Sequence, residues 1–243
     1  MGAAVRSAAV RAGRAWAVSG GLRVAFYPVM LNLSGRLALV VGAGPVGLRK
    51  ARGLLDAGAL VRLVAPQRAE DFDHPALEWH PRTYRPADLE GAALAFAATG
   101  DGAVDSRVAD DARARGIWVN VAADPDGGDV IVPAVRRCGP LTLAVASGGA
   151  SPAAAALAAD RAVQSLGVGW QRFALVAGAL RRLSLTEKKR ATYNRTVLQG
   201  LLGDGLVELL ERGDRQAVDA LLQRHCGVEG LAALEINRAD LPL

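Results

Sequence analysis

The sequence predicts an α/β protein: a Rossmann-like, doubly wound parallel sheet, followed by a hairpin, a helix and a small helical domain. Three observations lead to this fold. An apolar run at 37–41 meets a glycine motif and then becomes a helical pattern. Strand-like and helix-like segments alternate from there to Val121, as in successive βαβ units. From Trp170 onward the pattern is helical and rich in Leu, Arg and Glu.

The glycine motif has G-x-G-x-x-G spacing, at Gly42, Gly44 and Gly47. The first glycine permits a sharp turn off the strand, the second lets a pyrophosphate approach the backbone, and the third lets the helix pack closely. Pro45 suits the first turn of the helix expected at 46–57, where its missing N–H costs nothing. The free N–H groups and the helix dipole there favour an anion. Glycine turns without ligands are common, but here the sequence also predicts a strand, a helix and a second strand around the turn, which favours dinucleotide binding.

The second strand, expected at 60–65, lacks the acidic residue that binds the ribose in a typical NAD site. Either the backbone and Gln67 take over the ribose, or the nucleotide binds less conventionally. Arg68 alone does not establish a site for a 2′-phosphate, because a surface arginine after a strand is the commoner case. NAD and NADP therefore stay open on these residues. The expected cofactor-binding residues are Gly42, Gly44, Pro45, Val46, Pro66, Gln67 and Thr99.

The rest of the sheet domain continues the alternation. We expect a short strand at 76–83, a turn at 86–91, a strand at 94–98, a helix at 104–115 closed by Gly116, and a strand at 117–121. Ligands of parallel sheets bind at the carboxyl ends of the strands. Thr99, Asn120 and the following loop therefore belong to the same edge as Gly42.

The pattern then changes to two short strands, expected at 129–135 and 141–146, which 136–140 joins as a hairpin. Ser151 is a natural N-cap for an Ala-rich helix that runs to Leu166, and 167–169 is an expected hinge. No acidic residue occurs between Asp129 and Asp160, so this region suits a polyanionic ligand. The alternative is a dimer-forming hairpin whose arginines lie in solvent.

Composition narrows the function classes. Four arginines in the first 25 residues account for most of the net charge of +5, so the remaining chain is nearly neutral and a nucleic-acid-binding face is not expected. The Ala- and Arg-rich arm resembles a transit peptide, but the favoured interpretation is a disordered extension or a misplaced start codon. No apolar run is long enough for a membrane span. Two distant cysteines fit a reducing, cytoplasmic compartment, and three scattered histidines give no metal site.

The assembled motifs resemble those of the precorrin-2 dehydrogenase / sirohydrochlorin ferrochelatase family, the N-terminal module of siroheme synthases. The matching phrases, in order, are Tyr27-Pro28, Leu31-Asn32-Leu33, Val40 to Val46, Arg49-Lys50-Ala51, Val64-Ala65-Pro66, Ala97-Ala98-Thr99, Val119-Asn120-Val121, Val132-Pro133-Ala134 and Ser147 to Pro152. They cover residues 26–166, and the helical tail matches only in character. In this family Val-Ala-Pro is a usual end of the second strand, so the missing acid is no longer anomalous.

The resemblance implies NAD-dependent oxidation of precorrin-2 to sirohydrochlorin, with iron insertion in some members, by a homodimer formed through the hairpin region. Precorrin-2 carries several carboxylates, which fits the acid-free segment. The implied substrate-binding residues are Asn120, Arg136, Arg137, Ser147, Gly148 and Gly149. The domains are then a flexible basic arm at 1–25, an NAD-binding domain at 26–132, a dimerisation region at 133–166 and a helical C-terminal domain at 167–243.

One departure concerns the proposed acid/base. The family places an Asp three residues after the strand-end Asn, whereas this chain has Ala123 there and its nearest carboxylate is Asp124. Asp124 is therefore the candidate catalytic residue, and a structural Asp-Pro turn is its alternative role. The same departure puts iron insertion in doubt. It also keeps a competing function open, in which the chain is a non-catalytic nucleotide- or tetrapyrrole-binding module that serves as a sensor or partner.

Overall fold

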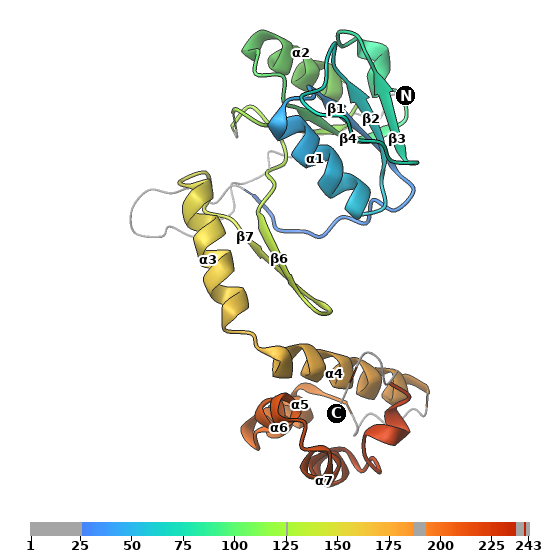
Figure 1. Ribbon diagram of the computed structural model, residues 1–243, viewed down its shortest axis with the longest axis vertical. Helices are drawn as coiled ribbons and strands as arrows, with labels where there is room; N and C mark the ends of the chain where they lie inside the picture. Colours follow the sequence, from blue (N-terminus) through green and yellow to red (C-terminus); the bar gives the residue numbers. More distant parts are fainter. Residues whose placement is uncertain (1–25, 125, 187–192, 237–240, 242–243) are drawn as a thin grey trace, which may run out of the picture. The chain divides into compact units, whose positions relative to one another are not determined.

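The computed structural model describes residues 26–124, 126–186, 193–236 and 241, and the arm expected at 1–25 lies outside them (Figure 1). The chain divides into two compact units. The first is Met1–Val132 with Gly148–Ala150, and the second is Pro133–Ser147 with Ser151–Leu243. Each unit is built around its own apolar clusters of buried side chains.

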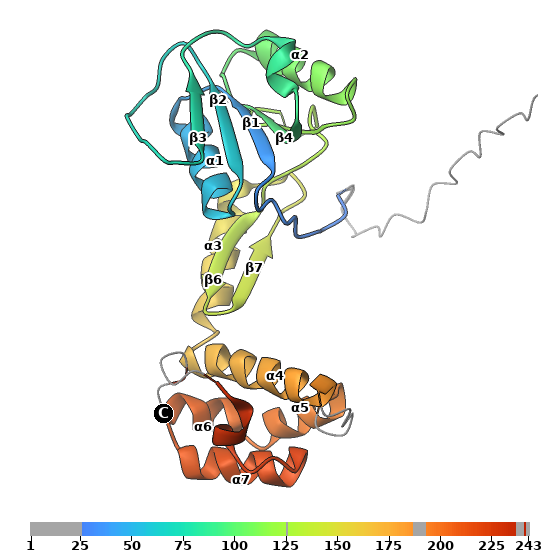
Figure 2. The same cartoon turned by 90° about the vertical axis from the view of Figure 1, so that its right-hand side faces the viewer.

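The described part of the first unit is a five-stranded parallel sheet with the order β3-β2-β1-β4-β5, which Figure 2 shows with β3 at its edge. The strands are β1 (Leu37–Val41), β2 (Leu60–Val64), β3 (Leu77–His80), β4 (Ala92–Ala97) and β5 (Trp118–Val121). The helices are α1 (Pro45–Asp56) and α2 (Gly102–Arg113), with a 3₁₀ turn η1 at Pro86–Leu89. This confirms the predicted doubly wound α/β fold. The strand order reverses between β1 and β4, and such a switch point is where open parallel sheets bind ligands.

Alternate residues of β1 face the two layers of the core. Ala38 and Val40 pack in the cluster that contains the buried residues of α1, while Leu39 and Val41 pack with those of α2. The helices therefore cover opposite faces of the sheet. In register, Val41 lies beside Val64 and Ala97, so the three central strands end together at one edge.

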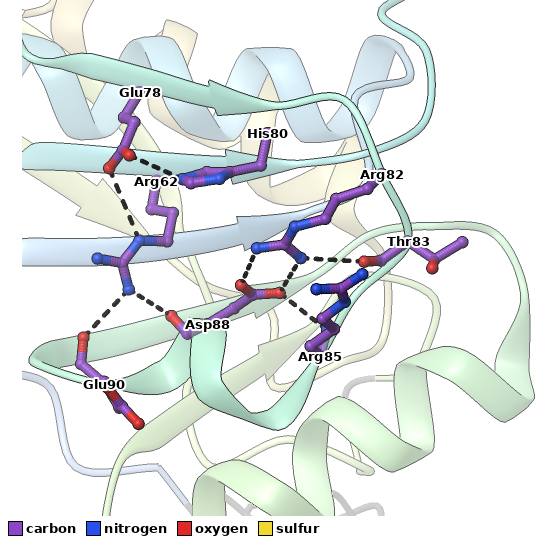
Figure 3. Close-up of polar contacts among 8 residues, drawn as sticks. All are labelled: Arg62, Glu78, His80, Arg82, Thr83, Arg85, Asp88 and Glu90. Carbon is purple, nitrogen blue, oxygen red and sulfur yellow. Dashed lines mark hydrogen bonds and ion pairs between the residues drawn. The ribbon is translucent and has the colours of Figure 1, made fainter.

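Ion pairs and hydrogen bonds connect η1 with the strands β2 and β3 and the segment after β3 (Figure 3). Asp88 in η1 is only 4% exposed and accepts two hydrogen bonds from the Arg82 guanidinium, at 2.6 and 2.9 Å, and a third from the Arg85 N–H at 2.8 Å. Burial alone would raise the pKa of Asp88, but these hydrogen bonds and the Arg82 charge hold it below its usual value. Arg62 on β2 donates to the carbonyl oxygens of Asp88 and Glu90, which ties η1 to the sheet.

The second unit begins with an antiparallel hairpin of β6 (Ala134–Cys138) and β7 (Leu141–Val145), followed by α3 (Pro152–Gln164). The expected strand at 129–135 and connection at 136–140 are wrong. Gly139 has φ of +55°, which permits a two-residue turn with Pro140, so both arginines lie within β6. The N–H groups of Asp129 and Val130 instead donate to the Val119 carbonyl, at 2.7 and 3.1 Å.

The predicted N-terminus of α3 is confirmed, because the Ser151 hydroxyl accepts from the Ala154 N–H and Pro152 is the first helical residue. The remaining helices are α4 (Val168–Thr186), α5 (Arg195–Gly203), α6 (Leu206–Arg212) and α7 (Arg215–Cys226), with a 3₁₀ turn η2 at Leu231–Leu234. The expected hinge at 167–169 overlaps the connection between α3 and α4 and the start of α4. Gly169 lies inside α4, and a Cβ there would come within 2.4 Å of the Val207 carbonyl oxygen, so it serves close packing of α4 on α6. None of the described helices is long and apolar enough to cross a membrane.

Candidate functional site: the carboxyl edge of the sheet

The turn between β1 and α1 has the geometry that the glycine motif predicts. Gly42 has φ of +102°, and a Cβ there would lie 2.3 Å from the Ala98 carbonyl oxygen. A Cβ on Gly47 would lie 1.9 Å from the Gly42 carbonyl oxygen, so α1 packs closely against the turn. Gly44 differs, because a Cβ there would meet nothing within 4 Å. The backbone at Gly44 therefore borders open space.

The N-terminus of α1 suits an anion. Gly44 is its N-cap and Pro45 its first residue, and it has neither a capping side chain nor an acidic residue in the first turn. The N–H groups of such a turn need an acceptor from outside the helix. Together with the helix dipole and the open approach at Gly44, they fit a phosphate group.

The loop after β2 lies next to this turn, because the Ala69 N–H donates to the Ala43 carbonyl at 2.9 Å. Pro66 and Gln67 are exposed on it. The Arg68 side chain is engaged by nearby residues. Its guanidinium lies 4.1 Å from the centre of the Trp79 ring and donates to Asp71. The side chain is 12% exposed. Arg68 therefore holds the loop, which agrees with a structural role for it.

Thr99 follows β4 on the same edge, with its backbone N–H beside Gly42. Its hydroxyl donates to Asp105 Oδ1 at 2.7 Å, and its N–H donates to the same oxygen at 3.1 Å. Asp105 in α2 is 2% exposed, so it fixes the turn that carries Thr99. The structure thus brings Thr99 and the glycine turn together.

Asn120 is buried near the carboxyl end of β5, with 6% exposure. Its Nδ2 donates to the Val130 carbonyl at 2.7 Å, which fixes the amide orientation because a carbonyl oxygen can accept only from nitrogen here. Oδ1 is then buried, and no donor among the described residues bonds to it. Since buried polar atoms are nearly always hydrogen-bonded, this acceptor is a candidate ligand contact.

Lys50 on α1 is a functional candidate that the sequence interpretation did not assign. Its Nζ lies 5.8 Å from the centre of the Phe96 ring on β4. Partial burial, and then the neighbouring Arg49 charge, lower the pKa of Lys50. It makes no ion pair with another described residue. The signal in the sequence is its spacing, three residues after Gly47 and four before Leu54, which places a lysine on the packed face of the helix.

Ala123 and Asp124 follow β5 and line one cavity of about 380 Å³ beside α2. The cavity wall also includes Asp105, Asp110 and Arg113. Asp124 is exposed, and its Oδ1 accepts from the Asp126 N–H at 3.1 Å, so it also shapes the local turn. A carboxylate at position 124 thus borders the same space as position 123. The described residues contain no cluster of His, Cys, Asp or Glu that could hold a metal ion.

Comparisons with known proteins agree with a nucleotide-binding domain in this part of the chain. Residues 29–134 match a family described as "Putative NAD(P)-binding". A siroheme synthase of Chromobacterium violaceum is 38% identical over 214 residues, which are 84% of this chain and 44% of that protein. The siroheme synthase of Azotobacter vinelandii is 38% identical over 205 residues, 81% of this chain and 44% of that protein.

The chain is thus similar to siroheme synthases over more than four fifths of its own length. It spans about 44% of the length of these two relatives. A solved structure, "SirC, precorrin-2 dehydrogenase", shares the fold with a TM-score of 0.60 at 24% identity, and the match covers 82% of this chain and 98% of that one. The match to an NAD(P)-binding family supports a nicotinamide cofactor.

The other residues that the family resemblance implies have local roles in this structure. Arg136 donates to Asp160 on α3 at 2.6 Å, and this bond lowers the pKa of Asp160. Arg137, the next residue of the strand, is exposed. The Ser147 hydroxyl accepts from the Ser151 N–H at 2.9 Å. Gly148 and Gly149 have φ of +62° and +90°, so this loop requires glycines.

Proposed function

We propose that this chain oxidises precorrin-2 to sirohydrochlorin with NAD as the hydride acceptor, as a step in siroheme or related tetrapyrrole synthesis. The observation that carries the proposal is the open, uncapped glycine turn at Gly44 in a chain that is similar to siroheme synthases. The name of the structural neighbour, a precorrin-2 dehydrogenase, supports the same reaction.

The residues at the edge fit a dinucleotide. Gly42, Gly44, Pro45 and Val46 would hold the pyrophosphate, with Pro66, Gln67 and Thr99 beside the rest of the cofactor. When bound, the cofactor supplies the hydride acceptor, and one proton leaves the substrate for each hydride. We propose NAD in preference to NADP because Arg68, the nearest cation after β2, is engaged by Trp79 and Asp71.

Asn120, Arg136, Arg137, Ser147, Gly148 and Gly149 remain the proposed substrate-binding residues. Arg137 is the more accessible of the two arginines, because Arg136 is paired with Asp160. Asp124 is the proposed acid/base, since it borders the same cavity as Ala123, the position of the family's Asp. We also propose that the protein works as a homodimer in the cytoplasm.

A second candidate is a non-catalytic module that binds nucleotide or tetrapyrrole. Two features favour it: the Ala123 replacement, and the use of Asp124 in its own turn. One assay separates the two functions. The full chain is mixed with enzymatically made precorrin-2 and either NAD or NADP, and NADH or NADPH absorbance is followed.

The dehydrogenase proposal expects one NADH for each sirohydrochlorin formed, with NADP much the poorer acceptor. Tight tetrapyrrole binding without reduced nucleotide would support the non-catalytic module instead. Adding ferrous iron to the same mixture tests iron insertion, because siroheme and sirohydrochlorin differ in absorbance.

A further inference from the structure

Lys50 and Asn120 approach Phe96 from two elements on one face of the sheet. Lys50 Nζ lies over the Phe96 ring from α1. Asn120 is the register partner of Phe96 in the neighbouring strand, and direct partners in parallel strands point to the same side. Val130, which accepts the Asn120 amide hydrogen bond, packs against the same cluster as Phe96. All three side chains therefore belong to the α1 face.

This place lies close to the carboxyl edge of the sheet. Phe96 and Asn120 are each one residue from the end of their strands. Helical side chains lean toward the helix N-terminus, so Lys50 leans toward the same end of α1 as the glycine turn. The site is thus on the edge already described, but on the β4–β5 side of the switch point.

The two polar groups differ in hydrogen-bonding character. A lysine side chain can only donate when charged, and Asn120 Oδ1 can only accept. A carboxylate has no donor for the buried Oδ1, so it would satisfy only half of the pair. A primary carboxamide has a carbonyl that accepts and an amino group that donates. A carboxamide therefore complements both groups.

We propose that Lys50 and Asn120 hold the carboxamide of the nicotinamide ring, Lys50 donating to its carbonyl and Asn120 Oδ1 accepting from its amino group. This assignment moves Asn120 from the proposed substrate-binding residues to the cofactor-binding residues. The inference rests on the proposed function, and it places the adenosine half of the cofactor toward β2. The other half then extends over β4 and β5. The pair would fix the face of the ring that meets the substrate.

The first test varies the ligand and leaves the protein intact. Calorimetry compares NAD⁺, its 3-acetylpyridine analogue and ADP-ribose on the full chain. The analogue keeps the carbonyl and replaces the amino group with a methyl, so it should bind about tenfold more weakly, the scale of one buried hydrogen bond. Equal affinity for NAD⁺ and the analogue overturns the assignment of Asn120.

The second test varies the protein. Lys50→Met supplies an apolar side chain in place of the lysine stem but removes the amino group that donates. It should weaken NAD⁺ binding about tenfold while leaving ADP-ribose affinity unchanged. Arg49→Met is the matched control, since Arg49 is the exposed cation next to Lys50 on α1, and it should change neither affinity. Unchanged NAD⁺ affinity in Lys50→Met overturns the role of Lys50.

The failures of the two proposals can be told apart. Wild-type protein that binds neither NAD⁺ nor ADP-ribose removes the dinucleotide site and the carboxamide pair together. Wild-type protein that binds NAD⁺ and ADP-ribose equally keeps the dinucleotide site and removes only the pair. ADP-ribose affinity also reports whether Lys50→Met is folded. If the variant does not fold, the comparison of NAD⁺, its analogue and ADP-ribose on the wild-type protein tests the proposal.

Discussion

One substitution separates the two roles of Asp124, which are acid/base catalysis and shaping of the local turn. An Asn at this position keeps an oxygen that accepts from the Asp126 N–H, so the turn is preserved, but it cannot take a proton. If Asp124 is the base, Asp124→Asn should lower turnover about a hundredfold or more, the usual scale for loss of a general base. NAD affinity should stay the same. The measurement is NADH formation beside calorimetry.

Wild-type turnover in Asp124→Asn would limit the residue to shaping its turn. The complementary change is Ala123→Asp, which restores the family's arrangement and adds a second carboxylate to the wall of the same cavity. It should raise the rate of oxidation or create iron insertion.

A substitution at Gly44 should change NAD binding without lowering the stability of the protein. It is the N-cap of α1, and a Cβ there meets nothing within 4 Å, so Gly44→Asp should fold with an equal or slightly higher melting temperature. Its carboxylate would occupy the place of the pyrophosphate and should weaken NAD binding by at least about tenfold.

The matched control for Gly44→Asp is Gly53→Asp, at another open glycine of the same helix. It should leave NAD affinity unchanged. Equal affinities in all three proteins would contradict the placement of the pyrophosphate.

At the scale of single residues, the sequence predicted what the backbone motif dictates. The roles of Gly42 and Gly47 follow from spacing, and the structure confirms them because a Cβ at either would strike backbone. The unpaired Oδ1 of Asn120 could not be predicted, since it depends on the distant Val130 carbonyl taking up the amide nitrogen. Lys50 belongs to a phrase that matches the family, but the sequence gives it no role beyond that of a cation on an apolar helix face.

Among the elements, η1 has a pH-dependent attachment. The folded-state pKa of Asp88 is lowered, so its contribution is present above the unfolded carboxyl pKa of about 4 and is lost as the pH falls through the lower folded value. Asp88→Asn should cost about 2 kcal/mol in free energy of unfolding at neutral pH. The difference from wild type should shrink below about pH 4.

Urea unfolding at pH 7 and pH 3 measures this difference. Asp110→Asn serves as the control, because Asp110 is 80% exposed in its 3.8 Å ion pair with Arg113 and such pairs contribute little. A gap between Asp88→Asn and wild type that is as large at pH 3 as at pH 7 would show that shape, and not charge, matters at Asp88.

Element boundaries were predictable where strand and helix periods alternate, as for β1, α1, β2 and β5. The hairpin was misplaced because Arg136 and Arg137 are polar and precede Gly-Pro, a composition typical of a connection. In the structure only Gly139 and Pro140 turn, and the arginines alternate across β6. Which face of a two-stranded hairpin is covered depends on α3, and the strand sequence alone does not contain that information.

For the whole molecule, the proposed homodimer needs a surface that the chain itself leaves exposed. Leu141, Leu143 and Val145 are half-buried on one face of β7, so we do not expect them to form the main dimer contact. Leu157 on α3 is 70% exposed and is a better candidate for that surface. Leu157→Asp should convert a dimer to monomer in sedimentation velocity at micromolar concentration, because a buried unpaired charge is costly.

The control for this prediction is Leu185→Asp on α4, where the leucine is 71% exposed. It should leave the sedimentation coefficient unchanged. A monomeric wild-type protein, or a dimeric Leu157→Asp, would remove α3 from the assembly.

The loop after β5 is closed by hydrogen bonds to a single residue of that strand, Val119. Val119 accepts the N–H groups of Asp129 and Val130 at 2.7 and 3.1 Å, and its own N–H donates to the Asp129 carboxylate at 3.3 Å. A loop whose ends are clasped in this way can change length at little cost, since even doubling it costs only about 0.6 kcal/mol in closure entropy. An insertion or deletion of one residue between the clasped ends would slide a carboxylate from position 123 to 124 and leave the strands untouched. This loop is therefore free to carry its acid at either position while the sheet stays constant.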